Sequence, residues 1–253
     1  MTSENKPSFV HLHVHTEYSM LDGLNKISRL VEKVKNAGMN AVALTDHGVM
    51  YGMFEFWKAC HDSGVKPIIG CEIYVAPTER THRQDVDGIR YYHLVLLAKN
   101  LIGYHNLIKL VSIGHLEGFY YRPRVDKEIL EKYSEGLICT SACPAGPLGR
   151  HILADQNNKA REWLEYLAKV YKDNFYLEVQ RHGLVGSDVL PKDATDFMKE
   201  QSAINTELIK WSKEYNLPLV ATTDAHYLDD SDEFTQEVLF AIKDGKTLED
   251  PTR

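Results

Sequence analysis

Short apolar runs alternate with helical patterns along most of this chain, and the alternation limits the folds open to it. Seven runs have the length of β-strands, and four are almost continuously apolar, as in strands buried on both faces. The runs span residues 9–14, 40–45, 67–75, 91–98, 136–141, 175–180 and 217–222. Helical patterns occupy residues 24–37, 51–62, 101–113, 157–172, 199–215 and 231–243.

Strand–helix alternation predicts an α/β protein with a parallel sheet and helices outside it. Seven such units favour a closed barrel, although the pattern is also compatible with an open sheet. The link between 67–75 and 91–98 is polar and has no helical pattern, so we expect a hairpin or excursion there and an irregular barrel. We find no internal repeat or domain linker in the 253 residues, which predicts a single domain.

Charge and apolar content exclude some classes of protein. The net charge of −7 argues against a protein that binds nucleic acid through an extended basic surface. No stretch approaches the roughly 18 apolar residues of a membrane span, and the first residues lack the apolar core of a signal peptide. The four cysteines show no disulfide-framework spacing, so we expect reduced thiols and a cytoplasmic protein with no membrane partner.

Histidines and carboxylates gather at the ends of the predicted strands, where barrels carry their sites. Residues i and i+2 of a strand share a face, so His13 and His15 point the same way, as do Asp224 and His226. The other strand-end candidates are Asp46, His47, Glu72, His93 and Cys143. A single strand histidine is usually a packed residue, but these repeated pairs favour a metal site. Imidazole, carboxylate and thiolate ligands suit zinc, manganese or iron.

Several motifs resemble the polymerase-and-histidinol-phosphatase (PHP) domain. They are HVHTEYSMLDG, ALTDHGVMYG, PIIGCEIYVAP, YYHLVLLAKN, GFYYRPRVDKEIL, SEGLICTSACPAG and LVATTDAHYL. The GFYY-x-PR and SAC-x-AG motifs resemble the branch found at the N-terminus of bacterial replicative DNA polymerase III α subunits. The resemblance implies a distorted (β/α)7 barrel, similar to a TIM barrel. It also implies that residues 1–253 are one PHP domain and the N-terminal piece of a larger α subunit.

The resemblance also implies a site for two to three divalent ions, zinc, manganese or iron. The implied ligands are His13, His15, Asp22, His47, Glu72, His93, Cys143, Asp224 and His226. One ion would bind His13, His15, Glu72 and Asp224; a second Glu72, His93 and Cys143; a third Asp22, His47 and His226. Glu72 and Asp224 are the expected catalytic carboxylates. Asp46 matches no ligand, so it either supports a neighbouring ligand or simply ends its strand.

The implied activity is that of a metal-dependent phosphoesterase with 3′–5′ exonuclease action on DNA 3′ ends. The parent subunit would be a DNA-directed DNA polymerase, and we expect no polymerase activity from this chain alone. Expected partners are the rest of the α subunit and a separate proofreading exonuclease subunit. Two alternatives stay open, a stand-alone phosphomonoesterase and a catalytically silent, metal-stabilised scaffold. The candidates for phosphate binding, which could equally be surface salt-bridge partners, are Arg122, Arg124, Arg181 and His182.

Overall fold

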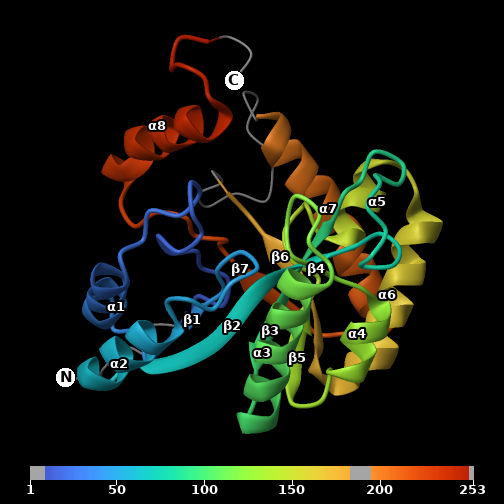
Figure 1. Ribbon diagram of the computed structural model, residues 1–253, viewed down its shortest axis with the longest axis horizontal. Coiled ribbons are helices and arrows are strands. Elements are labelled where there is room, and N and C mark those ends of the chain that lie inside the picture. Colours follow the sequence, from blue (N-terminus) through green and yellow to red (C-terminus); the bar gives the residue numbers. More distant parts are fainter. Residues whose placement is uncertain (1–8, 183–194, 251–253) are drawn as a thin grey trace.

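The computed structural model describes residues 9–182 and 195–250, which form a curved sheet surrounded by helices (Figure 1). The strands are β1 (Ala41–Leu44), β2 (Lys66–Val75), β3 (Tyr92–Ala98), β4 (Arg124–Val125), β5 (Leu137–Thr140), β6 (Phe175–Gln180) and β7 (Leu219–Thr222). The helices are α1 (Ile27–Asn36), α2 (Met53–Ser63), α3 (Leu101–Leu116), α4 (Lys127–Lys132), α5 (Pro147–Leu153), α6 (Asn157–Tyr171), α7 (Asp196–Glu214) and α8 (Glu233–Asp244). Two 3-10 turns are η1 (Lys172–Asn174) and η2 (Asp230–Asp232).

The sheet has the strand order β1-β2-β3-β5-β6-β7, with β4 paired to β2. The pairs β1–β2, β5–β6 and β6–β7 are parallel, whereas β3 is antiparallel to both β2 and β5. The chain between Val75 and Tyr92 has no helix to carry it back across the sheet, so β3 returns in the opposite direction. The expected hairpin and the irregular barrel are therefore confirmed.

The N-terminal segment joins the two ends of this strand order. His11 pairs with Val42 of β1, and Val14 pairs with Ala225 just after β7. The prediction of a regular strand over 9–14 was wrong, because the Val14 amide donates to the Thr45 hydroxyl (2.8 Å) instead of to a carbonyl of the ladder. The segment thus closes a distorted barrel through isolated bridges, and this places His13 and His15 inside it.

The predicted helices are all present, with ends that differ from the prediction by a few residues. The elements β4, α4 and α5 were not predicted, because they have 2, 6 and 7 residues and are too short for a periodic pattern to show. The main core lies between β2, β3, β5 and β6 and the helices α3, α6 and α7; it includes Leu94, Leu107, Leu164 and Trp211. Cys71 faces this core.

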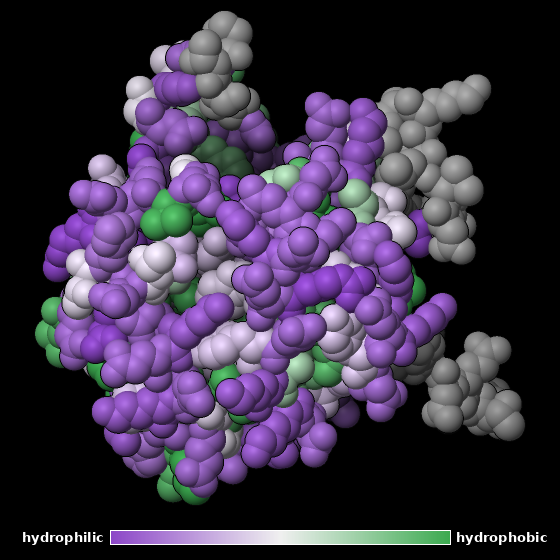
Figure 2. Space-filling model, turned by 90° about the vertical axis from the view of Figure 1, so that its right-hand side faces the viewer, coloured by the Kyte–Doolittle hydropathy of each residue, from purple (hydrophilic) through white to green (hydrophobic). Residues whose placement is uncertain are grey.

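The outer surface of the helices on one side of the sheet is mostly polar. Figure 1 shows α5, α6 and α7 on the right-hand side of the sheet, and the same side is mostly hydrophilic in the space-filling view (Figure 2). The apolar faces of these helices are therefore turned toward the sheet, as expected for the outer layer of a barrel. Within the described residues, no helix combines the length and apolar character needed to span a bilayer.

Candidate metal centre

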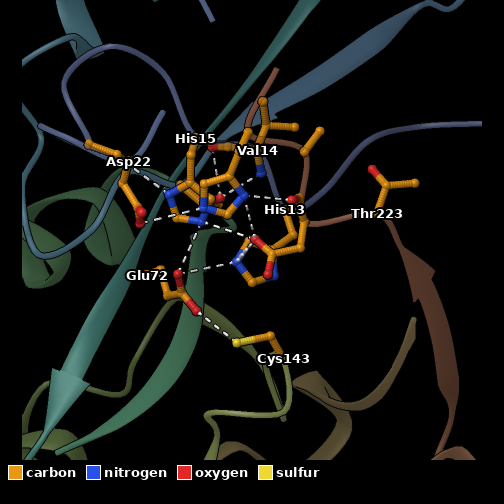
Figure 3. A network of polar contacts seen from close by, with 12 residues as sticks. His13, Val14, His15, Asp22, Glu72, Cys143 and Thr223 are labelled. Atoms are coloured by element: carbon orange, nitrogen blue, oxygen red, sulfur yellow. Dashed lines mark hydrogen bonds and ion pairs between the residues drawn. The ribbon is translucent and has the colours of Figure 1, made fainter. Parts of the chain in front are cut away.

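Side-chain atoms of four residues converge at the ends of the barrel strands (Figure 3). The Nε2 atoms of His13 and His15 lie 3.3 and 3.0 Å from Oε2 of Glu72, and each is 3.2 Å from Oδ1 of Asp224. The four atoms are buried, and none makes a hydrogen bond within the described part of the chain. Buried polar atoms without partners are costly, and imidazole nitrogens with carboxylate oxygens are a zinc or manganese donor set. The residues present therefore fit a divalent ion.

The second ring nitrogens of the two histidines fix which nitrogen carries the proton. His13 Nδ1 donates to Oε1 of Glu178 (2.8 Å), a carboxylate that is acceptor only. His15 Nδ1 lies 2.9 Å from the Ser19 hydroxyl, which donates its own proton to Asp46 (2.7 Å) and so accepts from His15. In the neutral ring, each Nε2 therefore directs a lone pair toward Glu72 and Asp224, as a metal ligand must.

Asp46 holds the turn that carries His15. Its carboxylate accepts hydrogen bonds from the Thr16 amide (2.6 Å), the Thr16 hydroxyl (2.7 Å) and the Ser19 hydroxyl. Ser19 in turn accepts from the His47 amide (3.1 Å). Of the two roles considered for Asp46, the structure thus favours support of neighbouring residues over a mere strand end.

Glu72 also faces a second group of side chains that could bind a metal ion. Its Oε1 lies 3.0 Å from Nδ1 of His93 and 3.6 Å from Sγ of Cys143, and the sulfur is 3.8 Å from the same His93 nitrogen. Figure 3 shows Glu72 between the histidines and Cys143. Ala142 has a left-handed conformation (φ 62°), which turns the chain so that Cys143 faces inward. The Glu72 carboxylate therefore lies between two groups of potential metal ligands.

A third group surrounds Asp22. Its Oδ2 lies 2.8 Å from Nε2 of His47 and 3.6 Å from Nε2 of His226. His226 Nδ1 donates to the main-chain carbonyl of Asp224 (2.8 Å), so Nε2, which faces Asp22, is the nitrogen available to a metal ion. The other nitrogen of His47, Nδ1, lies 2.9 Å from Oε2 of Glu72 and links this group to the first. All nine predicted ligands thus lie in one cluster, and their binding of metal stays a prediction.

Comparison with known proteins gives the family. The PHP domain model matches residues 11–182, more than half of the chain. The chain belongs to the PHP domain family. The match ends before Asp224 and His226, which the tertiary structure brings to the histidines of the matched region.

Relatives of this PHP domain are bacterial polymerase subunits. The chain is 47% identical over 246 residues to "DNA polymerase III subunit alpha" of Borreliella burgdorferi, covering 97% of this chain and 20% of the relative. It is 44% identical over 248 residues to the protein of the same name in Treponema pallidum, with coverage of 97% and 20%. The chain thus spans about a fifth of the length of these relatives.

A solved structure shares the fold of this PHP domain. It is an amidohydrolase from Chromobacterium violaceum, 12% identical, with a TM-score of 0.52 and coverage of 91% of this chain and 96% of that one. The distorted barrel expected from the sequence is confirmed.

Burial and charge pull the pKa values of the cluster in opposite directions. Burial alone would lower the pKa of His13, but the negative charges of Asp224, Glu72 and Glu178 raise it well above its usual value. Burial and the nearby His47 and His226 lower the pKa of His15. In the metal-free cluster, His13 therefore holds its proton more tightly than His15 does. A divalent ion must displace such protons to bind.

Helix α8 contributes to the same region in a way the sequence analysis missed. Lys243 donates to Oδ1 of Asp22 (2.7 Å), and the Gln236 side chain donates to the Asp22 carbonyl (2.5 Å). Burial would raise the pKa of Asp22, but hydrogen bonds from His226, His47 and Lys243 lower it strongly. The helix thus keeps Asp22 ionised and in place.

Glu178 was also missed, although the sequence carries a signal for it. It is the only charged residue in the run FYLEVQ, which forms a strand of the barrel, and it is buried. Buried carboxylates are rare without a specific partner. A charge inside an otherwise uncharged strand could therefore have marked it as a partner of the site.

Arg124 has a structural role, so its prediction as a phosphate-binding residue was wrong. Its side chain is fully buried, and Nε donates to the Gly118 carbonyl (3.2 Å). Its other nitrogens donate to the carbonyls of Arg90 (3.1 Å), Arg80 (3.1 Å) and His82 (2.7 Å). These bonds hold three loop segments together and leave no donor aimed at the cluster.

The other three predicted phosphate-binding residues differ in their surroundings. His182 donates from Nε2 to the Thr223 carbonyl (2.6 Å), and its Nδ1 accepts from Gln201 (2.6 Å), so both ring nitrogens are used within the fold. Arg181 is exposed just after β6. Arg122 is exposed beside the cluster, in a cleft that Asp22 and His47 also line.

Proposed function

We propose that this PHP domain is a metal-dependent phosphoesterase that removes nucleotides from DNA 3′ ends, within a bacterial DNA polymerase III α subunit. The observation that carries the proposal is the set of buried, unpartnered atoms of His13, His15, Glu72 and Asp224. The similarity to polymerase α subunits supports DNA as the substrate. In this setting the partners are the rest of the α subunit and a separate proofreading exonuclease subunit, in the cytoplasm.

The nine clustered side chains are the proposed ligands of two to three divalent ions, zinc, manganese or iron. When bound, such ions supply positive charge for phosphoryl oxygens and lower the pKa of water. Glu72 and Asp224 are the proposed catalytic carboxylates. Glu72 would be shared by two of the ion sites, because Oε2 faces His13 and His15 while Oε1 faces His93.

Access to the cluster favours catalysis over a purely structural role. His13, His15 and Glu72 are fully buried, but Asp22 and His47 line a surface cleft of about 210 Å³. Structural metal sites are closed, whereas catalytic sites keep a side open to substrate. The cleft gives a phosphoester a route to one edge of the cluster, which supports an enzyme rather than a silent scaffold.

Elemental analysis and an activity comparison test this proposal. We expect two to three transition-metal ions per chain and release of nucleotides from a 3′-labelled oligodeoxynucleotide with manganese or zinc. Chelation should abolish the release and lower the melting temperature, and added metal should restore both, because the ions bind only the folded site.

Three other results would each contradict part of this proposal. Hydrolysis of p-nitrophenyl phosphate without attack on DNA would favour the phosphomonoesterase. Tightly bound ions with neither activity would favour the scaffold. Fewer than one ion per chain, with no effect of the chelator, would contradict the ligand assignment itself.

A further inference from the structure

An aromatic cleft opens directly beside the metal cluster. Its outer walls include Tyr51, Phe119 and Tyr121, whose side chains are 65%, 48% and 61% exposed, and Asp22 and His47 line its inner end. Large aromatic side chains are on average mostly buried in folded proteins. Three exposed rings around one cleft next to a polar cluster therefore indicate a surface for a planar ligand.

The loop that carries two of these rings is held rigidly. Gly118 and Arg124 lie at its two ends, and a Cβ on Gly118 would be 1.8 Å from the Arg124 carbonyl oxygen. The buried Arg124 guanidinium binds the Gly118 carbonyl and closes the loop, while Tyr121 adopts a left-handed conformation (φ 59°) at its tip. Because its backbone is fixed in this way, the loop presents Phe119 and Tyr121 to solvent without a large entropic cost of ordering on binding.

The cleft also contains a cation that forms no close ion pair with a carboxylate of the described residues. Arg122 forms no ion pair with any residue the structure describes, and its guanidinium lies 5.8 Å from the ring centre of Tyr74. The Tyr74 ring is in turn stacked on His47, with ring centres 5.8 Å apart. A guanidinium, exposed rings and candidate metal ligands thus follow one another along the cleft.

We infer that this aromatic cleft binds the last unpaired nucleotides of a single DNA strand. The rings offer faces on which bases stack, Arg122 offers a partner for a phosphodiester, and the inner end leads to the cluster. Bases inside a duplex already stack on their neighbours, so the cleft selects an unpaired end. The inference rests on the proposed function, because it assigns the strandedness of that substrate.

Equilibrium binding of a fluorescent twelve-residue oligothymidylate to the metal-loaded chain tests the cleft. Its terminal linkages are phosphorothioates, to slow cleavage. We expect Tyr51→Ala and Tyr121→Ala each to raise Kd roughly five- to a hundredfold, as loss of one stacked base does. Arg122→Gln should weaken binding and reduce its salt dependence. A blunt duplex and an oligonucleotide with abasic 3′-terminal positions should both bind less tightly than the unmodified strand.

The matched control is Trp57→Ala, which removes an exposed aromatic ring from α2 outside the cleft (44% exposed). It should leave Kd unchanged, and all variants should keep their metal content and melting temperature. Equal affinity of wild type, Tyr51→Ala and Tyr121→Ala would overturn the inference, as would equal affinity for the abasic end. Nuclease activity that persists beside such equal affinities would leave the proposed function standing. Ring-dependent binding by a chain with no nuclease activity would instead support the cleft and contradict the proposed function.

Discussion

Nδ1 of His13 lies 2.8 Å from Oε1 of Glu178, and both side chains are completely buried. The same carboxylate accepts hydrogen bonds from the hydroxyls of Thr140 and Thr222 and from the Gln180 side chain. Burial would raise the pKa of Glu178, but the charge of His13 and these hydrogen bonds lower it, so the group is ionised. An ionised, fully hydrogen-bonded carboxylate therefore fixes the ring of His13 before any ion binds.

Glu178→Gln should weaken metal binding while leaving the barrel intact. The amide has the size of the carboxylate, but it can present its NH₂ to His13 and favours the wrong ring tautomer. We expect metal affinity to fall about tenfold to a hundredfold, the usual effect of losing such a partner. Calorimetric titration with manganese measures it, and exposed Glu165→Gln is the control. An unchanged affinity would show that Glu178 serves packing alone.

Asp224→Asn should abolish most activity at little cost in stability. Asp224 has a left-handed conformation (φ 47°), which asparagine also tolerates, so the backbone should not change. The loss of the negative charge facing His13 and His15 removes a proposed ligand, and we expect at least a hundredfold slower nucleotide release, roughly 2.7 kcal/mol in activation free energy. The measurement is release from a labelled 3′ end with manganese or zinc.

Asp62→Asn, a change at an exposed carboxylate on α2, is the matched control and should leave the rate unchanged. Wild-type activity in a folded Asp224→Asn chain would mean that the nuclease is a contaminant or that the active site lies elsewhere.

Arg124 and Arg122 are two residues apart but should respond oppositely to substitution. Arg124→Ala leaves four main-chain carbonyls without their charged donor in the interior, and we expect a loss of about 3 kcal/mol in the free energy of unfolding. Arg122→Ala removes an exposed side chain and should change that free energy by less than about 0.5 kcal/mol. Urea unfolding of both variants checks the contrast, and similar losses would contradict it.

The metal-free chain should lose stability as pH rises. Burial would lower the pKa of His47, but the charge of Glu72 and hydrogen bonds to Asp22 and Glu72 raise it to about 9 in the folded protein. A raised pKa stabilises the fold fully below the unfolded value of 6.5, and this contribution disappears as pH rises through about 9. Melting of the chelated chain between these pH values should show the decline.

His47→Asn should reduce this pH dependence, leaving the part due to His13, whereas His61→Asn, at an exposed position on α2, should preserve it. Metal affinity should change in the opposite direction and strengthen with pH, because the proton on His47 leaves when an ion binds. A chelated wild type whose melting temperature is constant over this range would show that His47 is not protonated in the folded state.

Local patterns in the sequence were enough to locate most strands and the candidate metal ligands. In the described part of the chain, apolar runs and helical spacing marked six of the seven strands and the six long helices, because each pattern needs only a few neighbouring residues. The two-residue period of a strand turns the neighbours Cys71 and Glu72 to opposite faces, and in the structure Cys71 lies in the core and Glu72 faces the cluster. Short elements such as α5 lack enough residues for any period to appear.

Only the tertiary structure decided how distant groups combine. His13 meets Glu178, and Asp22 meets Lys243, across separations of 165 and 221 residues, which no local pattern encodes. The two arginines of the GFYY-x-PR motif look alike in the sequence, yet one is buried among carbonyls and the other lines the cleft. The chain itself determined which residues could bind metal. Their distances, their proton states and their access to solvent depended on the closure of the barrel, because burial and long-range pairing arise only when separate segments pack together.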